Sequence, residues 1–193
     1  LRSCRVGPSG VALALHCRLR AMARSAAVAL VFASVPACLD AAEDDDLVFS
    51  TAATEACLSE SPAESAVACV GRAAEACQAQ GFGQTNAGMA MCFAAERDFW
   101  DGRLNAAYGD LLALERDTDA ALREVGSSAP SSADALRDMQ RAWIVWRDAA
   151  CAYERSQWGG GSGAGPAGAA CQMQLTGTQA LALEARLAER RNQ

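Results

Sequence analysis

The chain has 193 residues, nine cysteines, one histidine and a net charge of −6, from 17 basic and 23 acidic side chains. All the cations are arginine, and alanine fills close to a quarter of the positions. The acidic balance argues against a nucleic-acid partner, because such binding depends on cations that meet phosphates. Much alanine with 6% aromatic residues favours packed helices over a sheet, in one domain.

The first 42 residues have the layout of an export signal. Arg18, Arg20 and Arg24 precede an apolar run over residues 26–35, which is followed by small residues near Ala37. The run is too short for a membrane-spanning helix, which needs roughly 20 apolar residues. We therefore expect residues 1–42 to be a signal peptide, with upstream read-through before a natural start at Met22.

The end of this signal allows two kinds of processing. Val35-Pro36-Ala37-Cys38 resembles a bacterial lipoprotein box, in which Cys38 becomes the lipidated first residue. The alternative is ordinary cleavage between Ala37 and Ala42. Both place the protein outside the cytoplasm, in the periplasm or cell envelope, with a lipid anchor only in the first case.

Removal of the signal also removes His16. From Glu43 onward there are 12 arginines and 22 acidic residues, a net charge of −10, and no imidazole. This excludes Ser-His and Cys-His dyads, and the chain has no closely spaced zinc-ligand motif. We expect no metal, no cofactor and no enzymatic activity.

Six cysteines remain in the exported part, an even number that is typical of three disulfides. Six cysteines allow 15 connectivities. Cys151–Cys171 is the first choice because it closes a glycine-rich stretch, and Cys77–Cys92 and Cys57–Cys69 are the next-simplest local closures.

The elements are expected in this order. Residues 43–60 form an acidic tether and N-terminal segment, before a helical domain over residues 61–193. Ser61-Pro62-Ala63-Glu64 has the pattern of a capping box and predicts a helix to about Ala79. Residues 81–88 are rich in turn-forming side chains.

Three further helices are predicted. The first runs from about Met89 to Val125, with Gly102 and Gly109 marking close backbone approach. The second is capped by Ser132, and the last spans about Gln172 to Arg190. The second helix has a presumed core face made of Leu136, Met139, Trp143, Trp146 and Ala150.

Residues 157–170, rich in glycine, are expected to form a long irregular loop before the last helix. The fold class is therefore all-α, a small disulfide-stapled bundle of about four helices.

Two motifs hold the candidate site residues on the helices. Asn105 and Tyr108 suit ligand binding, although a structural role in helix packing is favoured. Gln140, Trp143 and Arg147 share neighbouring stripes, and Arg147 is expected to pair with Glu96, Asp98 or Asp101 more than to act in catalysis. Trp143 and Trp146 are interpreted as core residues before they are a ligand platform.

The glycine-rich loop supplies the other candidates. Residues 159–163 lack the Lys-Ser/Thr and the preceding strand of a phosphate-binding loop. A long loop held by a disulfide suits insertion into a partner's cleft, with Trp158, Arg155 and Ser162 at the contact. The alternative, to which we give equal weight, is that the loop is an ordinary solvent-exposed connection between two helices.

The ordered motifs TNAGMAMC, WDGRLNAAY, QRAWIVWRDAAC and GGGSG, with a final cysteine before an LT segment, resemble the N-terminal-domain family of the lysozyme inhibitor LprI. The resemblance covers about residues 69–187. It implies an exported helical domain whose namesake binds and inhibits lysozyme. The motif positions carried over are Cys92, Leu104, Asn105, Tyr108, Gln140, Trp143, Arg147, Asp148, Cys151, Gly160, Ser162, Cys171 and Thr176.

Two features depart from the family pattern. Gln179 stands where the family often has arginine, which puts a surface or helix-packing contact in question. Cys57 and Cys69 are extra, which indicates an elaborated N-terminal part.

The leading hypothesis is therefore a protein-binding inhibitor of a basic, lysozyme-type glycosidase. The alternatives are a structural or adaptor helical module of the envelope without inhibitory activity, and a hydrolase that works through acidic side chains.

Overall fold

A computed structural model describes residues 47–193. The expectations about the signal peptide, Met22 and Cys38 fall on residues outside this described part. Within residues 47–193 the chain forms five α-helices and two 3-10 helices and no strand, so the all-α prediction is confirmed and the helix count is one higher than expected. The elements are α1 (Ala52–Glu60), η1 (Ala63–Cys69), α2 (Arg72–Gln78), η2 (Phe82–Gln84), α3 (Asn86–Glu124), α4 (Ser132–Ser156) and α5 (Ala164–Arg191).

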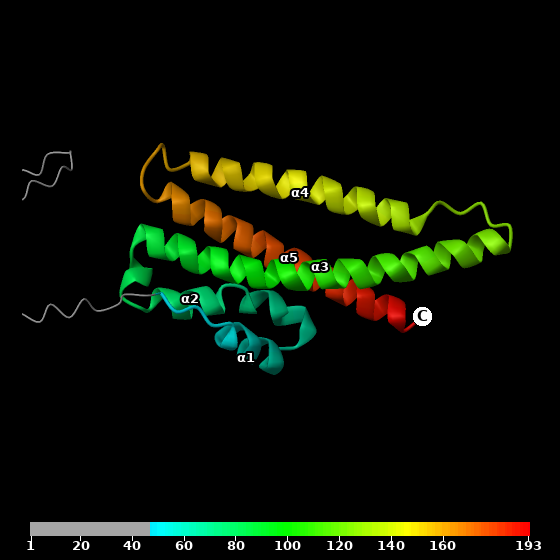
Figure 1. Cartoon of the computed structure of the whole chain (residues 1–193), viewed down its shortest axis with the longest axis horizontal. Helices are drawn as coiled ribbons and strands as arrows, with labels where there is room; N and C mark the ends of the chain where they lie inside the picture. Colours follow the sequence, from blue (N-terminus) through cyan, green and yellow to red (C-terminus); the bar gives the residue numbers. More distant parts are fainter. Residues whose placement is uncertain (1–46) are drawn as a thin grey trace, which may run out of the picture. The chain divides into compact units, whose positions relative to one another are not determined.

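The 39-residue helix α3 is the central element. Figure 1 shows α4 running back along α3, α5 crossing α3 obliquely, and α1 and α2 packed beside the first half of α3. The core lies mainly between α3 and α5. Its buried members include Trp100, Leu104, Leu111, Leu183 and Leu187, which recur at helical spacing along each helix.

Ion pairs at two levels join α3 to α5. Arg103 donates to both carboxylate oxygens of Glu184 at 2.8 Å. Arg190 donates to the two oxygens of Glu115 at 2.9 and 3.1 Å, and this carboxylate raises the pKa of Arg190 further above its usual value. Such forked pairs are geometrically selective, so they fix the crossing of the two helices.

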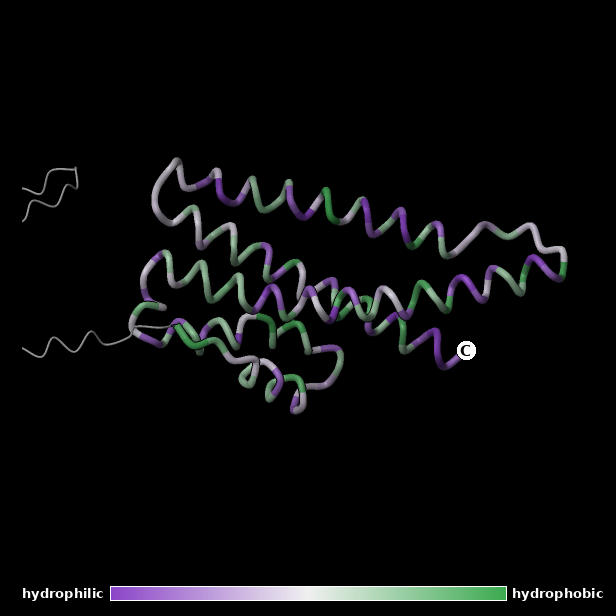
Figure 2. Tube along the Cα trace, in the orientation of Figure 1, coloured by the Kyte–Doolittle hydropathy of each residue, from purple (hydrophilic) through white to green (hydrophobic). Residues whose placement is uncertain are grey.

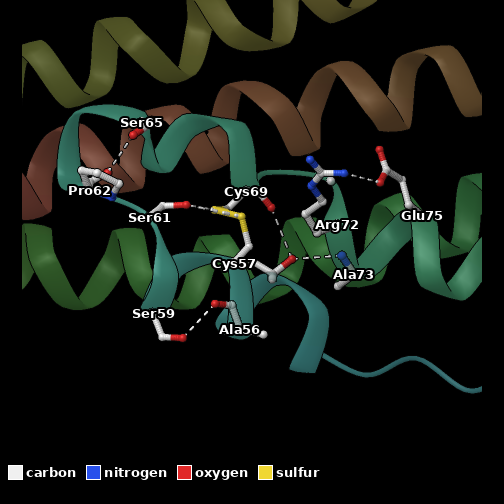
Figure 3. Close-up of a disulfide and its surroundings, with 12 residues drawn as sticks. Ala56, Cys57, Ser59, Ser61, Pro62, Ser65, Cys69, Arg72, Ala73 and Glu75 are labelled. Atoms are coloured by element: carbon white, nitrogen blue, oxygen red, sulfur yellow. Dashed lines mark hydrogen bonds and ion pairs between the residues drawn. A yellow bond between two sulfur atoms is a disulfide. The ribbon is translucent and has the colours of Figure 1, made fainter.

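The predicted capping-box helix over residues 61–79 is wrong. Pro62, not Ser61, precedes η1, and the chain turns at Gly71 before α2 begins. Gly71 has φ +104°, a conformation that favours glycine. The break has two physical causes. Cys69 is joined to Cys57 of α1 by a disulfide (Figure 3), and the backbone N–H groups at the start of α2 bind a side chain of α3 instead of continuing a helix.

Those N–H groups bind the carboxylate of Glu96, which is fully buried on α3. Oε1 accepts from the Gly71 N–H at 2.8 Å and Oε2 from the Ala74 N–H at 2.7 Å. The Thr54 hydroxyl and the Trp100 indole N–H donate to Oε1 at 2.9 and 3.0 Å. The side chain of Glu96 thus caps α2 and links α1, α2 and α3.

The three predicted disulfides are present: Cys57–Cys69, Cys77–Cys92 and Cys151–Cys171. The first joins α1 to η1, the second joins α2 to α3, and the third joins α4 to α5. In the described part of the chain, disulfides therefore close the connections between α1 and η1, between α2 and α3, and between α4 and α5, whereas the connection between α3 and α4 has none.

A carboxylate secures that remaining turn. Asp119 of α3 accepts from the Ser131 hydroxyl at 2.6 Å and from the Ser132 and Ala133 N–H groups at 2.9 and 3.1 Å. Ser131 in turn accepts from the Asp134 N–H, so it caps α4 in place of the predicted Ser132. The Ser131 hydroxyl and these backbone N–H groups lower the pKa of Asp119 below its usual 3.8.

The close helix approach expected at Gly102 and Gly109 occurs elsewhere. Both glycines face open space. A Cβ at Gly177 of α5 would instead lie 2.7 Å from Cγ1 of Val70 and 3.2 Å from the Trp100 ring. The missing side chain lets α5 pass close to the segment before α2.

The predicted core face of α4 is partly wrong. Leu136 and Trp143 pack against the core, but Trp146 is 56% exposed and Met139 is 42% exposed. The predicted loop over residues 157–170 is also shorter than expected, because α5 begins at Ala164 and only residues 157–163 form the turn. Pro166 lies in the first turn of α5, where a missing N–H costs nothing.

None of the helices in the described part of the chain has the length and apolarity needed to cross a membrane.

Candidate functional site

The candidate site residues divide into two groups. One group lies between α3 and α4, and the other lies at the turn between α4 and α5. We call the first the motif cleft and define it by the residues that line a polar hollow of about 360 Å³: Arg97, Asp98, Asp101, Arg147, Asp148 and Gln172.

Arg147 is one of the two cations of the motif cleft, with Arg97. Its guanidinium carbon lies 5.1 Å from the centre of the Trp143 ring, and its Nε and Nη2 donate to Asp148 at 3.0 and 2.8 Å. The expected pairing with Glu96 is wrong, because Glu96 is buried with other partners. Asp98 and Asp101 share the cleft with Arg147 without a direct bond to it.

The remaining motif residues of α3 and α4 have structural contacts. Asn105 donates to Asp101 on the same helix at 2.8 Å, and Tyr108 is half-buried against the core. Gln140 is buried and accepts from Gln179 of α5 at 3.1 Å. The amide of Gln179 therefore makes a helix-packing contact between α5 and α4.

The second group forms the tip, which we define as the turn 157–163 with the first turns of α3 and α5. The Trp158 ring covers Gly163 so closely that a Cβ there would collide with it. Ser162 accepts from the Asn86 amide at 2.8 Å, which joins the turn to α3. Arg155 lies with its aliphatic part against Gly168, where a side chain on the glycine would also collide with it.

The tip is uncharged. No charged residue occurs between Ala76 and Ala95 or between Gln157 and Leu183. A largely apolar groove of about 350 Å³ lies there, lined by Met89, Phe93, Trp158, Pro166 and neighbours. Figure 2 shows the pale, glycine-rich turn between α4 and α5 at this end. With Trp158 53% exposed, the tip presents an uncharged surface with one large, exposed aromatic side chain.

Among residues 47–193 no group of three or more His, Cys, Asp or Glu side chains is placed to hold a metal ion. All six cysteines of this part are in disulfides and so offer no thiolate.

Sequence comparison identifies the family. The profile of the lysozyme inhibitor LprI family matches residues 77–183, more than half of the chain. The chain belongs to the LprI family. The matched range includes the motif cleft and the tip and leaves α1 and η1 outside it.

A relative of this LprI-family chain is an uncharacterized 17.7 kDa protein from the puhA 5′ region of Rhodobacter capsulatus. It is 30% identical over 125 residues, which cover 64% of this chain and 76% of the relative. No solved structure matches the chain significantly.

Proposed function

We propose that the protein is an exported inhibitor that binds lysozyme or a related wall-degrading glycosidase. Membership of the LprI family carries this proposal. The three disulfides are typical of an oxidising compartment, and they support an exported location.

The tip is the contact surface that we assign to the glycosidase. The sugar-binding cleft of such an enzyme holds neutral, amide-bearing sugars beside catalytic carboxylates. A neutral insert avoids placing an acid against those carboxylates, and an exposed tryptophan is a frequent hot spot of protein interfaces. The tip meets both conditions with Trp158 and an uncharged, glycine-rich turn.

The rest of the protein helps the encounter. Residues 47–193 carry 12 arginines and 18 acidic residues, a net charge of −6. Attraction between this surface and a cationic glycosidase speeds association and weakens as salt rises. Charge thus guides the encounter, whereas the tip determines the fit.

The proposal is tested by lysis of bacterial cell walls with lysozyme in the presence of the purified, oxidised protein. Inhibition that saturates with inhibitor concentration supports the proposal. No inhibition at a large molar excess over each glycosidase tried would contradict it.

A matched pair of variants tests the contact surface. Trp158→Ala is expected to weaken inhibition by about 30-fold or more, the scale of an interface hot spot of about 2 kcal/mol. Trp146→Ala is the control, because Trp146 is equally exposed, at 56% against 53%, but lies on α4. If both variants inhibit equally well, the tip is not part of the interface with the glycosidase.

Charge at the tip gives a second test that does not remove packing. Gly165 is exposed in the first turn of α5 and has open space at its Cβ position. Gly165→Glu suits the start of a helix and leaves the fold intact, but it brings a carboxylate toward the acids of the glycosidase cleft. We expect weaker inhibition by Gly165→Glu than by Gly165→Gln.

A further inference from the structure

Helix α4 exposes a continuous apolar stripe on the face turned away from the bundle. Its buried residues, Ala133, Gln140 and Cys151, lie on the inner face. On the opposite face, the outer stripe consists of Ala142, Val145, Trp146, Ala149 and Tyr153, which recur at steps of three and four and are all exposed. Val145 is 71% exposed and Tyr153 is 65% exposed.

The outer stripe is a contiguous apolar patch and not a set of scattered single side chains. Val145, Trp146 and Tyr153 together expose on the order of 400 Å², given the areas of such side chains. The largest apolar patch on a monomer has about this area, and it is often an interaction site. The outer stripe thus indicates a partner for α4.

The charges of α4 show what kind of partner fits. The helix carries four arginines and four acidic residues and is neutral, although residues 47–193 have a net charge of −6. A strongly cationic partner would be expected to meet an acidic face. A helix that is neutral and bears both signs does not repel a second copy of itself, which a strongly charged helix would.

The positions of the charges give the arrangement. Arg141 and Asp148 are two turns apart on the same edge of the outer stripe, with side chains 71% and 54% exposed. In an antiparallel pair of helices related by a twofold axis, the same edge of each helix meets the other. Arg141 of one copy then lies beside Asp148 of the second copy, and this happens twice.

We propose that the protein forms an antiparallel, twofold dimer through the outer stripe of α4. In the register set by the charges, Val145 lies next to the twofold axis and Ala142 faces Ala149 of the second copy. The two alanines allow the helix axes to approach closely. This inference is independent of the proposed inhibition, because the stripe and the tip are different surfaces.

The expected dimer is weak. Two outer stripes with their charged edges approach the lower end of specific interfaces, about 1,200 Å² in total. Sedimentation velocity over a range of concentrations should therefore show a reversible monomer–dimer equilibrium. A protein that stays monomeric up to about millimolar concentration would overturn the proposal, since such a patch would then bind no second copy.

Charge exchange tests the arrangement without relying on any single variant. Arg141→Asp places Asp against Asp148 of a second copy, and Asp148→Arg places Arg against Arg141. Each variant alone is expected to dimerise at least tenfold more weakly than the wild type. An equimolar mixture should recover the dimer, because each opposed pair then joins Asp to Arg.

The mixture also separates the possible outcomes. Recovery shows that both variants are folded and that the two edges meet as proposed. A mixture that stays monomeric, with both variants folded by circular dichroism, would refute the antiparallel register. Val145→Glu should abolish the dimer, and Ala113→Glu, on an exposed position of α3, is its matched control.

Discussion

Replacement of Glu96 by glutamine tests the largest polar cluster of the core. The carboxylate of Glu96 is fully buried and is surrounded only by donors: the N–H groups of Gly71 and Ala74, the Thr54 hydroxyl and the Trp100 indole. Glutamine keeps the shape and one oxygen. Its NH2 group, however, must face either the Ala74 N–H or the three donors at Oε1.

The cost follows from this mismatch. If the amide oxygen stays with the three donors, the 2.7 Å bond from the Ala74 N–H is replaced by a contact between two donors. A hydrogen bond to a charged group contributes about 1.5–3 kcal/mol, and a buried unsatisfied donor adds to that loss. We expect Glu96→Gln to lower the free energy of unfolding by about 2–4 kcal/mol, which corresponds to a fall in Tm of about 5–15 °C.

Urea unfolding of the oxidised protein, followed by circular dichroism, measures this change. Asp98→Asn is the control, because Asp98 is exposed on the same helix and pairs only with its neighbour Arg97. The control should stay within about 0.5 kcal/mol of the wild type. A Glu96→Gln variant as stable as this control would refute the idea that the carboxylate holds α1, α2 and α3 together.

Three more predictions concern the frame of the molecule. Gly102→Ala should stabilise α3 by about 0.5–1 kcal/mol, whereas Gly177→Ala should destabilise the fold by about 1–3 kcal/mol through its collision with Val70. Thermal unfolding should therefore show a higher Tm for Gly102→Ala and a lower Tm for Gly177→Ala. Changes of the same sign would contradict this account of the packing. The pKa of Asp119 is lowered in the folded state, so at pH values above the unfolded pKa of 3.8 its carboxylate stabilises the start of α4. This contribution is lost as the pH falls through the folded pKa. Hydrogen exchange at the first turn of α4 should accelerate below pH 3.8 in the wild type, and much less so in Asp119→Asn. Replacement of Cys151 and Cys171 by alanine should lower the free energy of unfolding by about 3 kcal/mol and impair inhibition at temperatures where the bundle is still folded. The same change at Cys57 and Cys69 should leave inhibition intact. Equal loss of inhibition in the two double variants would contradict a special role of the tip.

The long helices and the bridges could be predicted because their causes are local. Apolar side chains at helical spacing mark α3, and short sequence separations favour each disulfide. The break in the segment 61–79 has a cause that lies far along the sequence, because the carboxylate of Glu96 accepts hydrogen bonds from the N–H groups at the start of α2. No pattern within that segment carries this information, and its capping box competes with a tertiary contact that is stronger.

Helix α4 shows a different limit. It carries apolar side chains on two faces, with Leu136 and Trp143 on one and Val145 and Trp146 on the other. Periodicity reports that both faces are apolar, but it does not say which one meets α3 and α5. Only the neighbours decide, and they leave Trp146 exposed.

The positions of the motif residues distinguish those that hold α4 in place from those that are free to contact a partner. Gln140 and Trp143 face inward and hold α4 against the bundle, and Arg147 is fixed over Trp143. Substitution of these residues would therefore act on the placement of α4 first and on a partner second. The tip follows directly from α4, so its position depends on that frame, while Cys151–Cys171 and the bond from Asn86 to Ser162 restrain its shape. A surface that is held in shape before binding loses less conformational freedom on association, and this would strengthen the binding that we propose for the tip.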